Sequence, residues 1–211
     1  IVFPLGDGGE GTAAVLTHHA RGSTVRMQVK DPLFRPIEAS YGLSADGRTA
    51  FVEMASASGL QLLTPDERNP LRTTTFGTGE MILDAIDKGA RHLILCIGGS
   101  ATHDCGAGMA EALGFNFLDT GGQPVSPTGE NLHRIAQIDS GGLRFDPGSL
   151  AVEVLCDVAN PLYGPLGAAH VYAPQKGADE KAVSILEEGA RHFAILLSEH
   201  TGKDMAHLPG A

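Results

Sequence analysis

Residues 92–108 read HLILCIGGSATHDCGAG, and this stretch decides the fold class. It opens with an apolar run from His92 to Ile97, which is typical of a strand buried on both faces of a sheet. A glycine-rich loop follows the run, and we expect a helix from about Met109 to Leu113. Strand, glycine loop and helix in this order indicate an α/β protein.

The same order recurs in other parts of the chain. We expect a strand over Ile1–Leu5, a loop reading GDGGEGT over residues 6–12, and a helix over Ala13–Arg21 that Thr12 can cap. Later, a strand of the buried type is expected over Val152–Cys156 and a long amphipathic helix over Ala182–His200. The recurrence favours parallel-sheet, Rossmann-like units within an α/β fold.

Three strands between these units are expected to form a β-meander. Thr24–Lys30 alternates apolar and polar residues with period two, which indicates a half-buried strand. Strands over Ile37–Leu43 and Ala50–Met54 follow, joined by a link that contains Asp46-Gly47, a strong hairpin signal. Residues 24–54 are therefore predicted to add a mixed part to the sheet.

The remaining segments carry weaker signals. A helix over Gly79–Gly89, capped by Thr78, has an apolar stripe and a glycine at its end. We expect a loop or short helix over Leu60–Asn69, a turn-rich region with a short strand or hairpin over Gly121–Gly148, and a short strand over Ala168–Ala173.

Composition excludes several classes of function. With 15 Lys and Arg against 25 Asp and Glu, the net charge is −10, and no basic stripe for nucleic acid is present. Apolar runs such as Leu93–Ile97 are far shorter than the roughly 18 residues that span a bilayer. Three cysteines without a CxxC pair indicate a reducing compartment, so we expect a cytoplasmic protein. P-loop and GxSxG motifs are absent.

Three aspartates follow predicted strands directly: Asp7, Asp104 and Asp157. The carboxyl ends of parallel strands form the ligand crevice of open α/β sheets. Carboxylates gathered there could hold Mg²⁺, which prefers oxygen ligands, and one of them could act as a general base. The alternative is that each aspartate caps a helix or closes a turn.

Two glycine loops could receive a ligand. In the Gly98–Gly108 loop, bare amides beside Ser100 and Thr102 make a candidate anion site, although glycines there could also serve a tight strand-to-helix connection. In the first loop, Asp7 and Glu10 stand beside glycines, so we expect a metal ion or a ligand with hydroxyl groups rather than bare phosphate. A capping turn is the alternative.

Two cations and a run of hydroxyls complete the candidate residues. Arg72 precedes three threonines that include Thr74, and its guanidinium could clamp a small carboxylate in a bidentate manner. Lys176, in the segment PQKG, could place an ammonium over phosphate. For both cations the alternative is an ordinary solvated side chain.

Seven blocks, in family order, make the whole chain similar to the bacterial type I glycerate kinases. They are Asp7–Thr12, Glu53–Leu60, Thr74–Glu80, Gly98–Thr102, Cys156–Leu162, Gly164-Pro165 and Pro174–Ala178. The resemblance implies an ATP-dependent kinase that phosphorylates D-glycerate with Mg²⁺, and the 2-hydroxyl is the expected acceptor. It further implies a two-domain protein of nearly twice this length, with a homodimer as one assembly open to it.

On this resemblance the chain is a fragment that lacks both ends of the family's sequence, and we expect it to have little activity alone. Residues 1–20 would be a remnant of a Rossmann-like domain. Residues 21–211 would be a mixed α/β region, mostly an inserted domain, with the meander at 24–54 and glycine-loop and helix units at 73–115 and 152–200.

The resemblance also gives expected roles to the candidate residues. Asp104 is the favoured base, with Asp7 and Asp157 as further catalytic candidates and all three as metal ligands. ATP would contact Gly98, Gly99, Ser100, Thr102 and Lys176. Glycerate would contact Glu10, Arg72 and Thr74.

Three departures from the family pattern stand out. His103 occupies a position where the family usually has Asn, Cys105 one where it usually has Gly, and Ala159 one where an Asp is usual. Carboxylates beside glycine loops also suit a metal-dependent phosphatase, and a non-catalytic module that binds sugar acids is a third reading.

Overall fold

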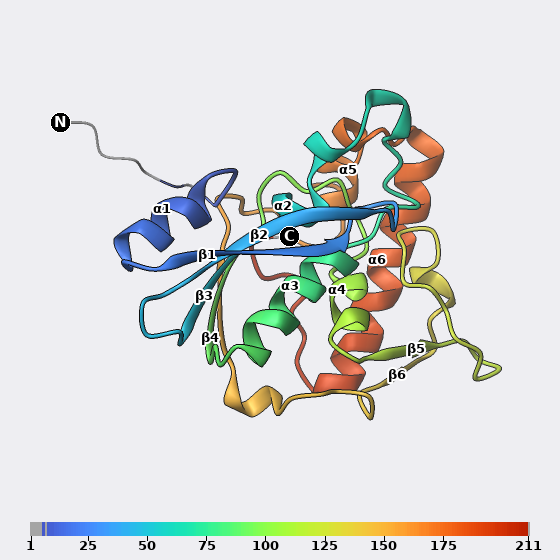
Figure 1. Cartoon of the computed structure of the whole chain (residues 1–211). Coiled ribbons are helices and arrows are strands. Elements are labelled where there is room, and N and C mark those ends of the chain that lie inside the picture. Colours follow the sequence, from blue (N-terminus) through green and yellow to red (C-terminus); the bar gives the residue numbers. More distant parts are fainter. Residues whose placement is uncertain (1–5, 7, 211) are drawn as a thin grey trace.

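The computed structural model describes residue 6 and residues 8–210, and its centre is a five-stranded mixed sheet of order β1-β2-β3-β4-β7 (Figure 1). The predicted strand over Ile1–Leu5 and the carboxylate of Asp7 lie outside the described residues. The sheet strands are β1 (Ser23–Lys30), β2 (Pro36–Leu43), β3 (Thr49–Glu53), β4 (His92–Cys96) and β7 (Ala151–Leu155). A second sheet pairs β5 (Asn116–Leu118) with β6 (Gln137–Asp139).

The type of strand pairing changes once across the main sheet. β1, β2 and β3 pair antiparallel, as the meander predicts, whereas β3, β4 and β7 are parallel. The register aligns Glu53 with Cys96 and Cys96 with Leu155. The carboxyl ends of three strands therefore meet at one edge of the sheet, which is where ligands bind in open α/β sheets.

Six α-helices are present among the described residues: α1 (Thr12–His19), α2 (Ala55–Ser58), α3 (Phe76–Asp87), α4 (Ala107–Ala112), α5 (Ala168–Tyr172) and α6 (Glu180–Thr201). Short 3₁₀ helices are η1 (Leu60–Leu62), η2 (Pro65–Glu67), η3 (Leu132–Arg134), η4 (Pro147–Ser149) and η5 (Pro174–Lys176). The α/β class predicted from the sequence is confirmed.

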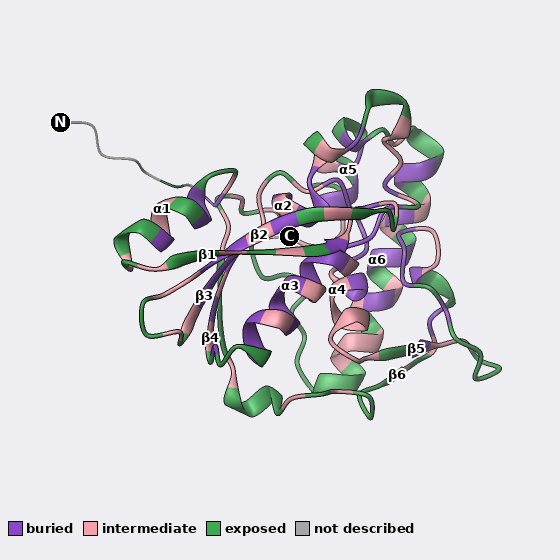
Figure 2. Ribbon diagram, in the orientation of Figure 1, coloured by how far each residue is buried: buried purple, intermediate pink, exposed green. Residues whose placement is uncertain are grey.

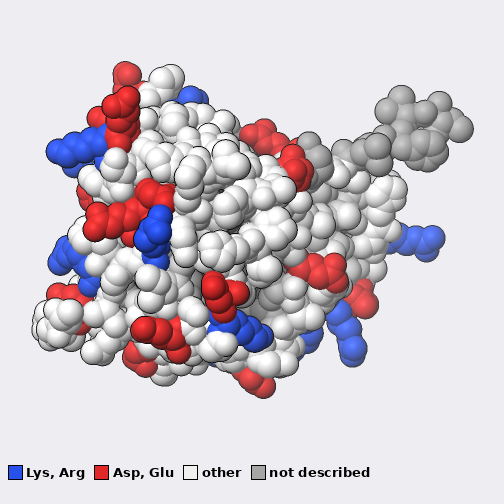
Figure 3. Space-filling view, turned by 180° about the vertical axis from the view of Figure 1, so that it is seen from behind, with Lys and Arg blue, Asp and Glu red and all other residues white. Residues whose placement is uncertain are grey.

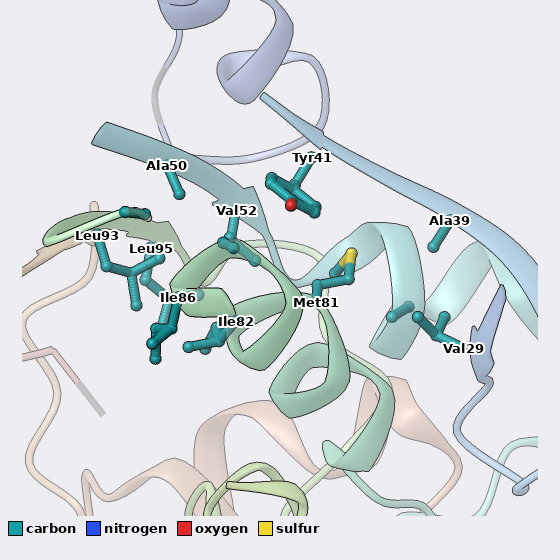
Figure 4. Close-up of a cluster of buried hydrophobic side chains, with 13 residues drawn as sticks. Val29, Ala39, Tyr41, Ala50, Val52, Met81, Ile82, Ile86, Leu93 and Leu95 are labelled. Carbon is teal, nitrogen blue, oxygen red and sulfur yellow. The ribbon is translucent and has the colours of Figure 1, made fainter. Parts of the chain in front are cut away.

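The main core lies between α3 and the sheet, where buried residues concentrate (Figure 2). Ile82 and Ile86 of α3 point toward Leu93 and Leu95 of β4, with Val52 of β3 beside them (Figure 4). α3 buries this stripe because its apolar side chains recur at helical spacing. A second cluster joins α6 to the small sheet through an edge-to-face contact of Phe117 and Phe193.

Two sequence predictions are wrong. Ala168–Ala173 was expected to be a strand, but α5 forms there, because its small side chains Ala169 and Ala173 pack against Leu186 of α6. The strand near Val152–Cys156 was expected to be buried, but β7 is the edge strand of the sheet that the described residues form, with exposed Val152 and Val154.

Charged side chains are intermixed on the face shown in Figure 3, where no basic stripe is visible. Within residue 6 and residues 8–210, no helix is both long enough and apolar enough to cross a membrane.

Candidate functional site

Three strand exits are hydrogen-bonded to one another at the carboxyl edge of the sheet. The amide of Ile97 donates to the carbonyl of Leu155 at 3.3 Å, and the amide of Gly98 donates to the carbonyl of Gly8 at 3.0 Å. On the other side, the amide of Met54 donates to the carbonyl of Cys96 at 2.9 Å. The first glycine loop, the loop after β4 and the exit of β7 therefore form one continuous surface.

This approach requires residues without side chains. A Cβ on Gly98 would lie 2.8 Å from the carbonyl oxygen of Gly8, and a Cβ on Gly8 would lie 2.9 Å from that of Leu155. Gly8 also has a φ of +93°, which L-residues rarely adopt. The glycines are thus needed for packing between loops, which was the alternative reading, and they also leave backbone amides uncovered.

The loop after β4 is held by hydrogen bonds to residues 58–60, while two amides in its middle are left without acceptors among the described residues. Leu60 donates to the carbonyl of Gly99 at 2.9 Å, and Ala101 donates to that of Ser58 at 2.8 Å. Among the residues that the structure describes, the amides of Gly99 and Ser100 have no acceptor. Two adjacent free amides can bind an anion such as a phosphate oxygen.

Lys176 reaches this loop from η5 and is buried. Its ammonium donates to the hydroxyl of Ser100 at 2.9 Å and to the carbonyl of Thr102 at 2.7 Å. Burial lowers the pKa of Lys176 to about 8, and the nearby Asp104 and Cys105 oppose this shift. The structure thus brings together three residues that the sequence placed in one candidate site.

His103 lies beside this lysine and is 7% exposed. Its Nε2 is buried without a hydrogen-bond partner in the described part of the chain. Burial, and then the charge of Lys176, lower the pKa of His103 to about 4. The imidazole is therefore neutral at physiological pH.

Asp104 lies where the starts of α3 and α4 meet, and it accepts hydrogen bonds from residues of both. Its Oδ2 accepts hydrogen bonds from the amide and hydroxyl of Thr75, at 2.7 and 2.9 Å, and from the amide of Gly108 at 3.2 Å. The amide of Gly106 donates to Oδ1 at 3.2 Å. Burial raises the pKa of Asp104, while the hydrogen bonds oppose the shift. A carboxylate with four donors and 1% exposure suits the capping alternative better than metal binding or general-base catalysis.

Thr74 and Arg72 are in contrasting environments. Thr74 is 1% exposed, and its hydroxyl accepts from the amide of Phe76 at 3.2 Å, so it supports the start of α3. This start lies three residues before the predicted one. Arg72 is exposed, and its guanidinium forms no ion pair with any described residue, so it is free to meet a carboxylate.

The other candidate acids are at the surface. Asp157, two residues past β7, and Glu10, in the first glycine loop, are both exposed. The carboxylate of Glu10 lies against the second loop, 3.9 Å from an ideal Cβ on Gly99. No group of three His, Cys, Asp or Glu side chains placed to hold a metal occurs within residue 6 and residues 8–210.

Glu53 belongs to the same edge of the sheet but was not among the predicted site residues. Its Oε2 accepts from the amides of Gly11 at 2.9 Å and Ala13 at 3.3 Å. The signal was present in the sequence, because Glu53 lies at the carboxyl end of a predicted strand, one residue before its last residue Met54.

Comparison with known proteins gives consistent relatives over the whole chain. A model of the glycerate kinase family matches residues 1–211. The chain is 46% identical over 211 residues to a glycerate kinase of Bacillus cereus and 42% identical over 211 residues to the glycerate 2-kinase of Escherichia coli K12. In each case the match covers 100% of this chain and 55% of the relative.

A solved structure gives the same result. The crystal structure of a protein assigned as glycerate kinase 2 in Salmonella typhimurium LT2 has a TM-score of 0.94 and 44% identity, covering 99% of this chain and 56% of that one. The chain therefore spans about half the length of the relatives that it matches.

Proposed function

Because the chain belongs to the glycerate kinase family, we propose that the intact protein transfers the γ-phosphoryl group of ATP to a hydroxyl of D-glycerate. The observation that carries the proposal is the family match over all 211 residues, with glycine loops and acids meeting at one sheet edge. In the reaction the glycerate oxygen forms a bond to the γ-phosphorus. The bond from that phosphorus to the bridging oxygen breaks, ADP leaves, and the hydroxyl proton passes to a base.

Positioning and charge neutralisation do most of the work in phosphoryl transfer. We assign the phosphates to the Gly98–Thr102 loop, whose free amides at Gly99 and Ser100 would bind their oxygens. The ammonium of Lys176 holds Ser100 and the Thr102 carbonyl in place and puts positive charge beneath the phosphates.

Glycerate and the base are assigned to exposed side chains. Arg72 would bind the carboxylate of glycerate, and Glu10 would accept a hydrogen bond from one of its hydroxyls. Asp157 is the preferred base because its carboxylate is exposed and has no hydrogen bond within the described residues. Asp104 is buried and fully bonded, which favours a role in holding the loops.

The described residues alone do not fit a Mg²⁺ site. Asp104 is occupied by four donors, and Asp157 belongs to no group of three potential metal ligands among the described side chains. A role for Mg²⁺ with Asp157 and Asp7 stays part of the proposal, and no step above depends on it. The 2-hydroxyl as acceptor, a cytoplasmic location and a homodimer are likewise proposed.

The test is turnover by the intact protein with ATP and D-glycerate, with ³¹P spectroscopy to identify 2- or 3-phosphoglycerate. ADP formed in equal amount to phosphoglycerate supports the kinase. Phosphate release that needs no glycerate would support a phosphatase instead, and glycerate binding without turnover would support a binding module. We expect residues 1–211 alone to show little turnover.

The role of Asp157 is tested by replacing it with Asn in the intact protein. We expect kcat to fall about 100-fold, since removal of a general base typically costs this order of rate, with little change in stability. Asp146→Asn is the matched control, because Asp146 bonds only to its own turn, before the amino end of β7. Equal kcat values for the two variants would show that Asp157 is not the general base.

A further inference from the structure

Glu53 is a buried acid at the carboxyl edge of the sheet, as Asp104 is, and the proposed chemistry does not use it. It is the last residue of β3, is 8% exposed, and pairs in register with Cys96 of β4. Both of its hydrogen bonds use one oxygen, Oε2, which receives the amides of Gly11 and Ala13. A strand end is thereby tied to the first turn of α1, about 40 residues away in sequence.

The hydrogen bond to Glu53 fixes Gly11, the residue that follows Glu10. Gly11 has a φ of +88° and is the residue from which α1 begins. Glu10 precedes it, and its carboxylate lies against Gly99 of the proposed phosphate loop. Because Gly11 is fixed to β3, the backbone that carries Glu10 is fixed relative to the loop after β4.

The charge of Glu53 supports the same role. No Lys, Arg or His forms an ion pair with it within residue 6 and residues 8–210. Its compensation comes from the amide groups and dipole of the α1 N-terminus, which favour an anion at this position. Since the position is already filled by Glu53, an incoming phosphate is left with the free amides of Gly99 and Ser100.

We propose that Glu53 is a positioning residue for Glu10: it fixes the first glycine loop so that Glu10 faces the ligand. The identity of that ligand as glycerate rests on the function proposed above. The hydrogen bonds of Glu53 to Gly11 and Ala13 do not depend on the identity of the ligand, so these bonds and the proposed function can be tested separately.

The experiment compares three variants of the intact protein. Glu53→Ala removes the acceptor, whereas Glu53→Gln can place an amide oxygen where Oε2 lies and keep both bonds without the charge. Asp84→Ala is the matched control, because Asp84 lies on α3, away from α1, and also accepts from a buried group, the hydroxyl of Tyr41 at 2.7 Å, besides the exposed ammonium of Lys88. Glu53→Asp, which withdraws the carboxylate by one methylene, replaces Glu53→Ala if that variant does not fold.

The first readout is hydrogen exchange at the amides of Gly11 and Ala13, which needs no substrate. We expect exchange to rise about tenfold or more in Glu53→Ala and to stay near the native rate in the other two variants. Unchanged exchange in Glu53→Ala would show that Glu53 does not hold the amides of Gly11 and Ala13.

The second readout is the KM for glycerate, which we expect to rise about tenfold in Glu53→Ala, to be largely restored in Glu53→Gln, and to stay native in Asp84→Ala. Combined with Glu10→Gln, Glu53→Ala should add little further loss, because both act through one side chain. Additive losses would overturn the positioning role. If the native protein neither binds nor phosphorylates glycerate, the proposed function fails, while the exchange result still decides whether Glu53 holds the two amides.

Discussion

His103 shows how one residue can link burial to pH. Its imidazole is 7% exposed and lacks a partner for Nε2 in the described structure. The ammonium of Lys176 beside it carries a positive charge. Protonation would place a second positive charge in the same buried region, which explains why its pKa falls to about 4. In the unfolded chain the same group titrates near 6.5. Below pH 6.5 the unfolded state therefore binds more protons than the folded state.

The consequence is a loss of stability as the pH falls from 6.5 toward 4. We expect His103→Asn to lose less stability than the native chain over this window, by up to about 1.4 kcal/mol per pH unit, the limit for one proton. Urea unfolding at several pH values measures the difference, with His200→Asn, on the exposed end of α6, as the control. Parallel pH profiles for the native chain and His103→Asn would contradict the account.

At the scale of elements, α3 and α4 pack so closely that their backbones nearly touch. Gly79 of α3 faces α4, and a Cβ there would lie 2.4 Å from the carbonyl oxygen of Met109. Gly79→Ala must push the helices apart, so we expect a loss of about 1–3 kcal/mol, the usual cost of overpacking, despite the better helix propensity of Ala. Thermal and urea unfolding measure it. Gly121→Ala, in an exposed turn with its nearest contact at 3.3 Å, should change stability little; a similar loss in both variants would rule out the packing explanation.

The elements also show which patterns the sequence could resolve. The period-two run of β1 and the apolar stripe of α3 predict those elements because their signals are local, although Thr78, the predicted cap, lies inside the helix. Residues 168–173 are ambiguous, since a short apolar run suits a strand or a helix, and only packing against α6 selects α5. Asp104 was ambiguous for a similar reason, because a capping aspartate and a catalytic one both follow a strand at a glycine loop.

At the scale of the whole molecule, sheet order decides what the local pattern could not. Val152 and Val154 are in register with Leu93 and Leu95, on the same face of the sheet, yet the leucines are 4% exposed and the valines 51% and 52%. α3 covers β4 but does not cover β7, which is the last strand of the sheet among residues 8–210. A strand's sequence does not state its place in the sheet, so the exposure of β7 was beyond prediction. The convergence of strand exits was predictable, because it follows from parallel strands alone.

This difference in position predicts unequal costs for one chemical change. Val52→Ala, on a central strand with 0% exposure, removes fully buried methyl groups, and we expect a loss of about 2 kcal/mol in residues 1–211. Val154→Ala removes the same groups from the half-exposed edge strand, and the loss should stay within about 0.5 kcal/mol. Urea unfolding of both variants measures the pair, and because the substitution is identical, differences in side-chain chemistry cancel. Equal losses would mean that β7 is covered as β3 is, and that the core does not end at β4.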